Sequence, residues 1–112
     1  MSSDLENLSP VELVRLLFRR AEELMAEAAS ALAEGRPEAA QAPIVRSQEV
    51  VAELLRALDL EKGGEVARNL RRLYIFVWER LVQAGLTADP VRLAEARKVW
   101  AGLRAAWEEV DA

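Results

Sequence analysis

The chain has 112 residues, of which 52% are hydrophobic and 30% charged, which predicts one globular domain over residues 1–112 rather than a disordered chain. It contains no cysteine and no histidine, which excludes disulfides, thiolate metal sites and cysteine nucleophiles and removes the commonest general base and transition-metal ligand. The net charge of -4 argues against a nucleic-acid partner, because non-specific binding to nucleic acid depends on neutralising phosphates.

The first eight residues, MSSDLENL, contain no basic segment followed by an apolar stretch, so they do not predict a secretory signal. Nowhere does an apolar run approach the ~18 residues that a membrane span requires. We therefore expect a soluble cytoplasmic protein with no membrane span.

The segment LSPVEL predicts the start of a first helix over about residues 10–34. Ser9 is a favourable N-cap, Pro10 suits the first helical position, and Glu12 completes a capping box. Gly35 supplies the stop, because glycine adopts the left-handed cap conformation without strain. Between these signals, apolar residues recur every three or four positions, at Val14, Leu17, Ala21, Leu24, Ala28 and Ala31.

A second helix is predicted over about residues 38–60, with an uncertain beginning. Pro43 lacks the N–H group that a helix interior needs, so the helix either begins near Ala42 or bends there. The segment DLEKGG ends it, with the turn at Gly63 and Gly64. Its apolar stripe is Ile44, Ser47, Val51, Leu55 and Leu58, with Leu54 beside it.

Two further helices are predicted, over about residues 65–84 and 90–110. Gly85 closes the third, and Asp89 as N-cap with Pro90 at the first position begins the fourth. The stripe of the third is Val66, Leu70, Leu73, Tyr74, Val77, Leu81 and Ala84. The stripe of the fourth is Leu93, Ala96, Trp100, Leu103, Trp107 and Val110, and we expect both tryptophans in the core.

Four amphipathic helices joined by short connections predict an all-α fold, an antiparallel up-down four-helix bundle. The hexamer LYIFVW, residues 73–78, has a strand-like composition, but the caps and the helical period on both sides of it favour a helix.

The third helix carries a second apolar stripe, formed by Ile75, Trp78 and Val82. On a helical wheel it lies roughly 110° from the centre of the first stripe, whereas Phe76 falls on the far side. Either this helix packs against two neighbours, or the stripe lines an exposed groove for a partner segment. The second interpretation places a groove between the second and third helices, with partner-binding residues Ile75, Trp78, Val82, Val50, Leu54 and Ala57.

The stretch LDLEKGGEVARNLRRLY, residues 58–74, resembles the FliS family of flagellin export chaperones. The resemblance rests on the pairs Leu58-Asp59, Gly63-Gly64, Asn69-Leu70 and Leu73-Tyr74. Three further segments agree in order and spacing: SPVELVRLLFRRA, VRSQEVVAELLRALD and LRAAWEEV, at residues 9–21, 45–59 and 103–110. The resemblance covers about residues 9–110 and implies an antiparallel helical bundle.

The resemblance also implies a function without catalysis or a cofactor. Members of the family bind the C-terminal segment of flagellin in the bacterial cytoplasm, prevent its premature polymerisation and aid its delivery to the flagellar type III export apparatus. Export-gate and other flagellar proteins are further candidate partners. The chain departs from the family pattern in having no tyrosine among the eight residues before the first cap, and in Phe18, Ile75 and Gly85, where tyrosine, aspartate and asparagine are frequent.

Two other classes of function compete with this one. A self-associating helical bundle would use the same apolar seam to bind copies of itself. The best case for an enzyme is a set of carboxylates inside the bundle, as in di-iron proteins, but those sites need Glu-x-x-His pairs. The chain has no histidine, and Glu22, Glu23 and Glu27 lie off the apolar stripe, so we expect no enzyme.

Overall fold

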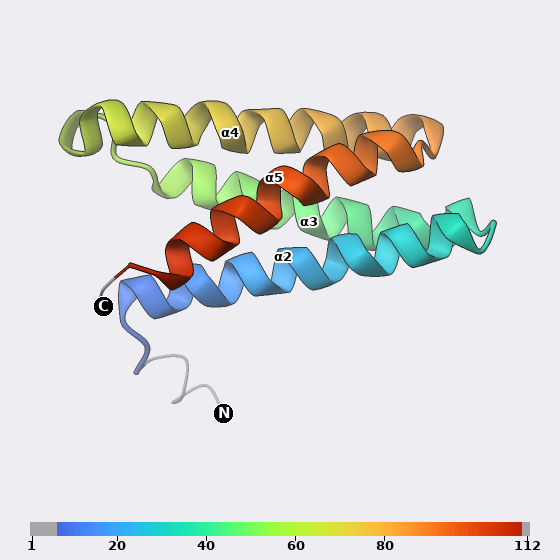
Figure 1. The fold of residues 1–112 in the computed structure, drawn as a ribbon, viewed down its shortest axis with the longest axis horizontal. Coiled ribbons are helices and arrows are strands. Elements are labelled where there is room, and N and C mark those ends of the chain that lie inside the picture. Colours follow the sequence, from blue (N-terminus) through green and yellow to red (C-terminus); the bar gives the residue numbers. More distant parts are fainter. Residues whose placement is uncertain (1–6, 111–112) are drawn as a thin grey trace.

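The computed structural model describes residues 7–110, which form a bundle of four helices (Figure 1). Helix α2 spans Pro10–Ala33, α3 spans Pro37–Ala57, α4 spans Leu60–Thr87 and α5 spans Pro90–Glu108. Each helix packs against the next one along the chain, and α5 also packs against α2, which closes the ring. The predicted all-α up-down bundle is therefore confirmed. The expectation that the first eight residues are not a secretory signal concerns mostly residues 1–6, which lie outside the described residues.

Side chains at the helix starts explain where three of the helices begin. At α2, Ser9 Oγ accepts from the Glu12 N–H at 3.1 Å, and Glu12 Oε1 accepts from the Ser9 N–H at 3.0 Å, forming the predicted capping box. The hydrogen bond from the Ser9 backbone holds the pKa of Glu12 below its ordinary value. Asp59 caps α4 by accepting from the Lys62 N–H, and Asp89 caps α5 by accepting from the Val91 N–H.

Helix α3 continues through Pro43, which settles the choice that the sequence left open. It begins at Pro37, close to the predicted start at about residue 38, so the alternative of a start near Ala42 is excluded. Pro43 is buried, and the buried Ser47 hydroxyl donates to its carbonyl oxygen at 2.7 Å. The helix ends at Ala57 rather than near residue 60, because Asp59 already serves as the N-cap of α4.

Helix α4 begins at Leu60, five residues before its predicted start, and the expected glycine turn lies inside it. Gly64 has φ 56° and ψ -133°, which is not helical, so it separates one short turn from a long rod. A residue with a Cβ atom is strained in this conformation, whereas glycine adopts it freely.

We expect Gly64→Ala to lower the free energy of unfolding by about 1–3 kcal/mol, the usual cost of such backbone strain. Urea denaturation followed by far-UV circular dichroism measures this change. Gly102→Ala is the matched control, because Gly102 is helical and an added Cβ would meet no heavy atom within 4 Å. Equal midpoints for the two variants would show that the backbone at residue 64 relaxes without cost.

The core centres on three aromatic side chains from three helices. Phe18 of α2 stacks on Trp100 of α5 with ring centroids 4.3 Å apart, and Tyr74 of α4 lies 6.0 Å from both rings. The Trp100 indole Nε1 donates to the Phe18 carbonyl at 3.0 Å. Trp107, which was also predicted to lie in the core, is only half-buried and packs against the edge of the core. Burial raises the pKa of Tyr74 above its ordinary value.

Two residues of the predicted α4 stripe lie outside the core. Val66 is 70% exposed and Leu73 is 40% exposed, whereas Tyr74, Val77 and Leu81 are buried. Figure 1 shows the reason: α5 starts beside the C-terminal end of α4 and crosses toward the N-terminal end of α2, leaving the first half of α4 uncovered on that side. None of the helices among residues 7–110 is both long and apolar enough to cross a membrane.

Candidate partner-binding surface

The three seam residues predicted on α4 remain accessible. Trp78 is 39% exposed, and Ile75 and Val82 are half-buried. Trp78 lies one turn before Val82, so the two share a side of the helix. Their own chain does not enclose them, and they therefore remain available for contact with a partner.

Val82 faces a depression of about 220 Å³ between α3 and α4, which we call the α3–α4 groove. A Cβ added at Gly85 would lie 3.5 Å from the Ile44 side chain, an ordinary van der Waals contact, so the spacing of the two helices does not require glycine there. At the same end, Gln41 Nε2 donates to the Gly85 carbonyl at 2.9 Å. The groove is lined by Gln41, Ile44, Val45, Gln48, Val82, Gly85 and Leu86.

The predicted α3 residues do not line this groove, so the six residues do not share one depression, and their role in binding a partner stays a prediction. Val50 lines a different depression, between α2 and α3, together with Leu17 and Leu24. Leu54 is buried in the core. Ala57 is exposed and borders a small cavity, whose other lining residues are Val14, Leu54, Leu58, Tyr74 and Trp107.

The reason is the side of α3 on which each residue lies. Val50 is displaced from the core stripe toward α2, whereas Gln48 and Val45 border α4. The periodicity of a single helix gives the angle between two stripes, but it does not say which neighbouring helix lies beyond each edge.

Two apolar residues at the groove were missed by the sequence reasoning. Val45 is 50% exposed and Leu86 is 79% exposed. Leu86 follows Gly85, which was interpreted as the end of the helix, whereas α4 continues to Thr87. A helical period extended past Gly85 would have placed Leu86 beside Val82, four positions earlier.

A second apolar depression, the α4–α5 wedge, lies where α5 diverges from α4. It measures about 250 Å³, and only apolar residues line it: Val66, Leu70, Ala106, Trp107 and Val110. The exposed side chain of Leu73 lies one turn further along α4 from Leu70. The structure thus presents two apolar areas on α4, one toward α3 and one toward α5.

Phe76 lies on the α5 side of α4 and is covered there, so its predicted place on the far side from the core is wrong. It is half-buried and packs against the core cluster. The Arg80 guanidinium lies 4.5 Å from the Phe76 ring centroid and also pairs with Glu95 of α5 at 3.1 Å.

Within residues 7–110, no group of three or more acidic side chains is placed to hold a metal ion.

A family model and several curated relatives match this chain over most or all of its length. The family model of the flagellar protein FliS matches residues 1–112. The flagellar secretion chaperone FliS of Salmonella typhimurium is 31% identical over 112 residues, which cover 99% of this chain and 83% of the relative. The flagellar secretion chaperone FliS of Campylobacter jejuni is 34% identical over 102 residues, covering 91% of this chain and 80% of the relative. The corresponding protein of Vibrio cholerae is 26% identical over 110 residues, covering 98% and 81%.

Proposed function

The chain belongs to the FliS family of flagellar secretion chaperones, and on that premise we propose that it binds the C-terminal segment of flagellin in the bacterial cytoplasm. Binding keeps the subunit from polymerising early and presents it to the flagellar type III export apparatus. The resemblance of residues 58–74 to the family, together with the match over the whole chain, supports this assignment.

The observation that carries the proposal is the number of large apolar side chains that α4 leaves exposed. Val66, Leu73, Trp78 and Leu86 are all exposed on this one helix, and Val45 of α3 adds to them at the α3–α4 groove. Scattered hydrophobic residues are ordinary on protein surfaces, but apolar areas gathered along one element mark interaction sites. An amphipathic segment laid along a helical groove is a common mode of peptide recognition.

We assign the α3–α4 groove and the adjoining Trp78 as the main seat of the client. An unassembled flagellin segment is expected to be amphipathic and largely disordered. Burying its apolar face contributes about 25 cal/mol for each Å² removed from water. Ordering the segment costs part of that gain, so the chaperone holds its client reversibly and releases it at the export apparatus.

Titration calorimetry with a flagellin C-terminal segment fused to an inert carrier tests the proposal. We expect saturable binding with a negative heat-capacity change, the mark of apolar surface buried on association. A carrier fused to a shuffled segment of the same composition is the control. Equal binding of both fusions would contradict recognition of flagellin.

Self-association through the same apolar seam is the second candidate, because the exposed residues of α4 would serve it equally well. Sedimentation with and without the flagellin segment separates the two. The chaperone hypothesis predicts that the segment forms a defined complex, whereas a stable homo-oligomer indifferent to the segment would favour self-association.

A further inference from the structure

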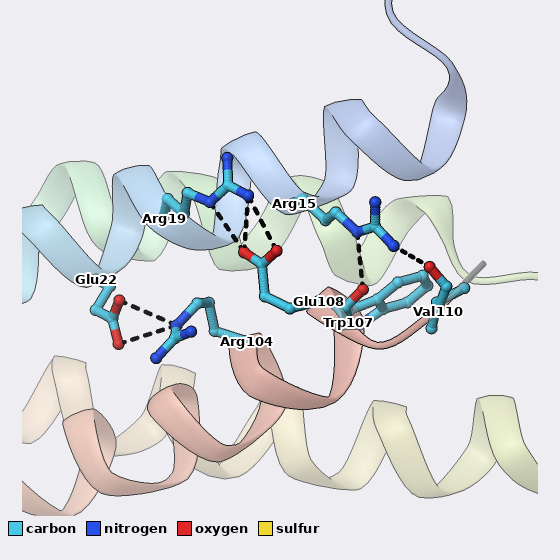
Figure 2. A network of polar contacts seen from close by, with 7 residues as sticks. All are labelled: Arg15, Arg19, Glu22, Arg104, Trp107, Glu108 and Val110. Carbon is cyan, nitrogen blue, oxygen red and sulfur yellow. Dashed lines mark hydrogen bonds and ion pairs between the residues drawn. The ribbon is translucent and has the colours of Figure 1, made fainter. Parts of the chain in front are cut away.

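The last two turns of α5 are attached to α2 by arginine side chains (Figure 2). Arg15 Nε donates to the Trp107 carbonyl at 2.9 Å, and its Nη2 donates to the Val110 carbonyl. Arg19 donates through Nε and Nη2 to the two carboxylate oxygens of Glu108, at 2.9 and 3.0 Å. The ion pair between Arg104 and Glu22, at 3.2 Å, ties the same stretch to α2 one turn earlier.

This end of α5 has little support within its own helix. Its last turn carries no basic residue, and Glu108 with the C-cap Glu109 places negative charge beside the free carbonyl groups. Negative charge at a helix C-terminus is unfavourable. Arg15 of α2 supplies the missing donor from outside. Because the side chains of Arg19 and Glu108 remain accessible to solvent, their pairing contributes little and is weakened by salt.

Gly102 lies near the end of the fixed part of α5, which closes with the buried Leu103; beyond Leu103 no residue of the helix is fully buried. Before it, Leu93, Ala96 and Trp100 are buried, and Trp100 is hydrogen-bonded to α2. Gly102 itself is exposed, and a Cβ there would meet no heavy atom within 4 Å, so packing does not require glycine. Glycine lowers the stability of a helix relative to alanine, which makes residue 102 a natural hinge.

The Trp107 side chain fills the space between residues 104–110 and the rest of the bundle. It borders the small cavity of about 90 Å³ between α2, α3 and α4, and it also borders the α4–α5 wedge of about 250 Å³. Its indole is therefore incompletely packed on two sides, in contrast to the fully buried Trp100. Moving Trp107 outward would join the two hollows.

We propose that residues 104–110 form a strap that detaches from α2 as a unit, hinged at Gly102, and that its opening lifts Trp107 to uncover one apolar trough. The trough takes in Val14, Leu54 and Leu70 from three helices, and Leu58 from the connection between α3 and α4. Resting on the proposed function, the uncovered trough is a second contact area for the same flagellin segment, separate from the α3–α4 groove. The apparent affinity for a flagellin segment at the trough is the intrinsic affinity multiplied by the fraction of open molecules.

Native-state amide hydrogen exchange tests the strap without any client. We expect the amides of residues 104–108 to exchange through an opening that leaves residues 93–100 protected. Arg15→Gln combined with Arg19→Gln is expected to raise the opening about five- to thirtyfold, and Gly102→Ala to lower it about fivefold. Arg56→Gln, which removes an exposed ion pair with Glu53 elsewhere, is the matched control and should change neither segment.

Two exchange results would overturn the strap. One is that residues 104–108 and 93–100 open together, with the same denaturant dependence in every variant. The other is that Gly102→Ala leaves exchange in residues 104–108 unchanged, as expected for a simply frayed helix end.

Binding of the carrier-fused flagellin segment then tests the regulatory role. Gly102→Ala is expected to weaken binding about fivefold, matching the loss of open molecules. Unchanged affinity with a slowed opening would refute the regulation while leaving the proposed function intact. Absence of binding by the unmutated chain would instead refute the proposed function and leave the exchange result standing.

Discussion

Trp100→Ala is expected to lower the free energy of unfolding by about 3–5 kcal/mol, the usual cost of truncating a fully buried aromatic residue. Trp100 is fully buried, stacks on Phe18 and donates its indole N–H to the Phe18 carbonyl. The substitution therefore leaves a cavity between α2, α4 and α5 and removes a buried hydrogen bond. Urea denaturation measures the change, and an unchanged slope would show that the folded and unfolded states keep their compactness.

Trp107→Ala is the matched control, because it removes the same side chain from the half-buried end of the same helix. We expect a clearly smaller loss of stability than for Trp100→Ala. Equal losses would show that the end of α5 is packed as tightly as its middle.

Trp78→Asp is expected to weaken binding of the flagellin segment roughly thirtyfold, about 2 kcal/mol, as for an aromatic residue at the centre of an interface. Helical content and the unfolding midpoint should change little, because more than a third of this side chain is already in water. Titration calorimetry measures the affinity, and far-UV circular dichroism measures the fold. A collapse of the dichroism signal would identify Trp78 as a core residue and the groove as misplaced.

Two controls distinguish the α3–α4 groove from other apolar surface. Val91→Asp places the same charge on an exposed residue at the start of α5, away from the groove, and should leave binding unchanged. Val66→Asp does the same at the α4–α5 wedge. Stronger loss of binding from Val66→Asp than from Trp78→Asp would move the client seat to the wedge.

Local sequence signals were enough to predict the helices and most of the core. The Ser9 capping box and the Asp89 cap are formed, and the stripes of α2 and α5 bury Ala21, Leu24, Leu93 and Trp100 as the spacing predicted. These features depend on residues a few positions apart, so a single stretch of chain determines them.

The boundary between α3 and α4 was not predictable in the same way. Asp59 was read as part of the second helix, whereas it caps the third, and the helical turn before Gly64 went unnoticed. An aspartate in such a position is compatible with a helix interior or with an N-cap. The choice depends on how the two helices pack.

The candidate site depended on information that one helix does not contain. Trp78 of the second apolar stripe on α4 is accessible, but the α3–α4 groove beside this stripe is lined by Val45 of α3 and not by the predicted Val50. To assign the neighbour on each side of α3, one must know whether the four helices follow one another in a left-handed or a right-handed order. Reversing this order would exchange the helices that lie beside the two edges of each apolar stripe. The exposure of Val66 and Leu73 likewise follows from the divergence of α5, which no local pattern encodes.

The pairing of the first and last helices also determines the order in which the newly made chain acquires its native interior. Trp100 follows its hydrogen-bond partner Phe18 by 82 residues, so the aromatic slot between α2 and α4 stays unfilled until α5 has been translated. At about 5–20 residues per second, the 19 residues of α5 take roughly one to four seconds to synthesise. During that interval the nascent polypeptide carries an open apolar slot at the ribosome.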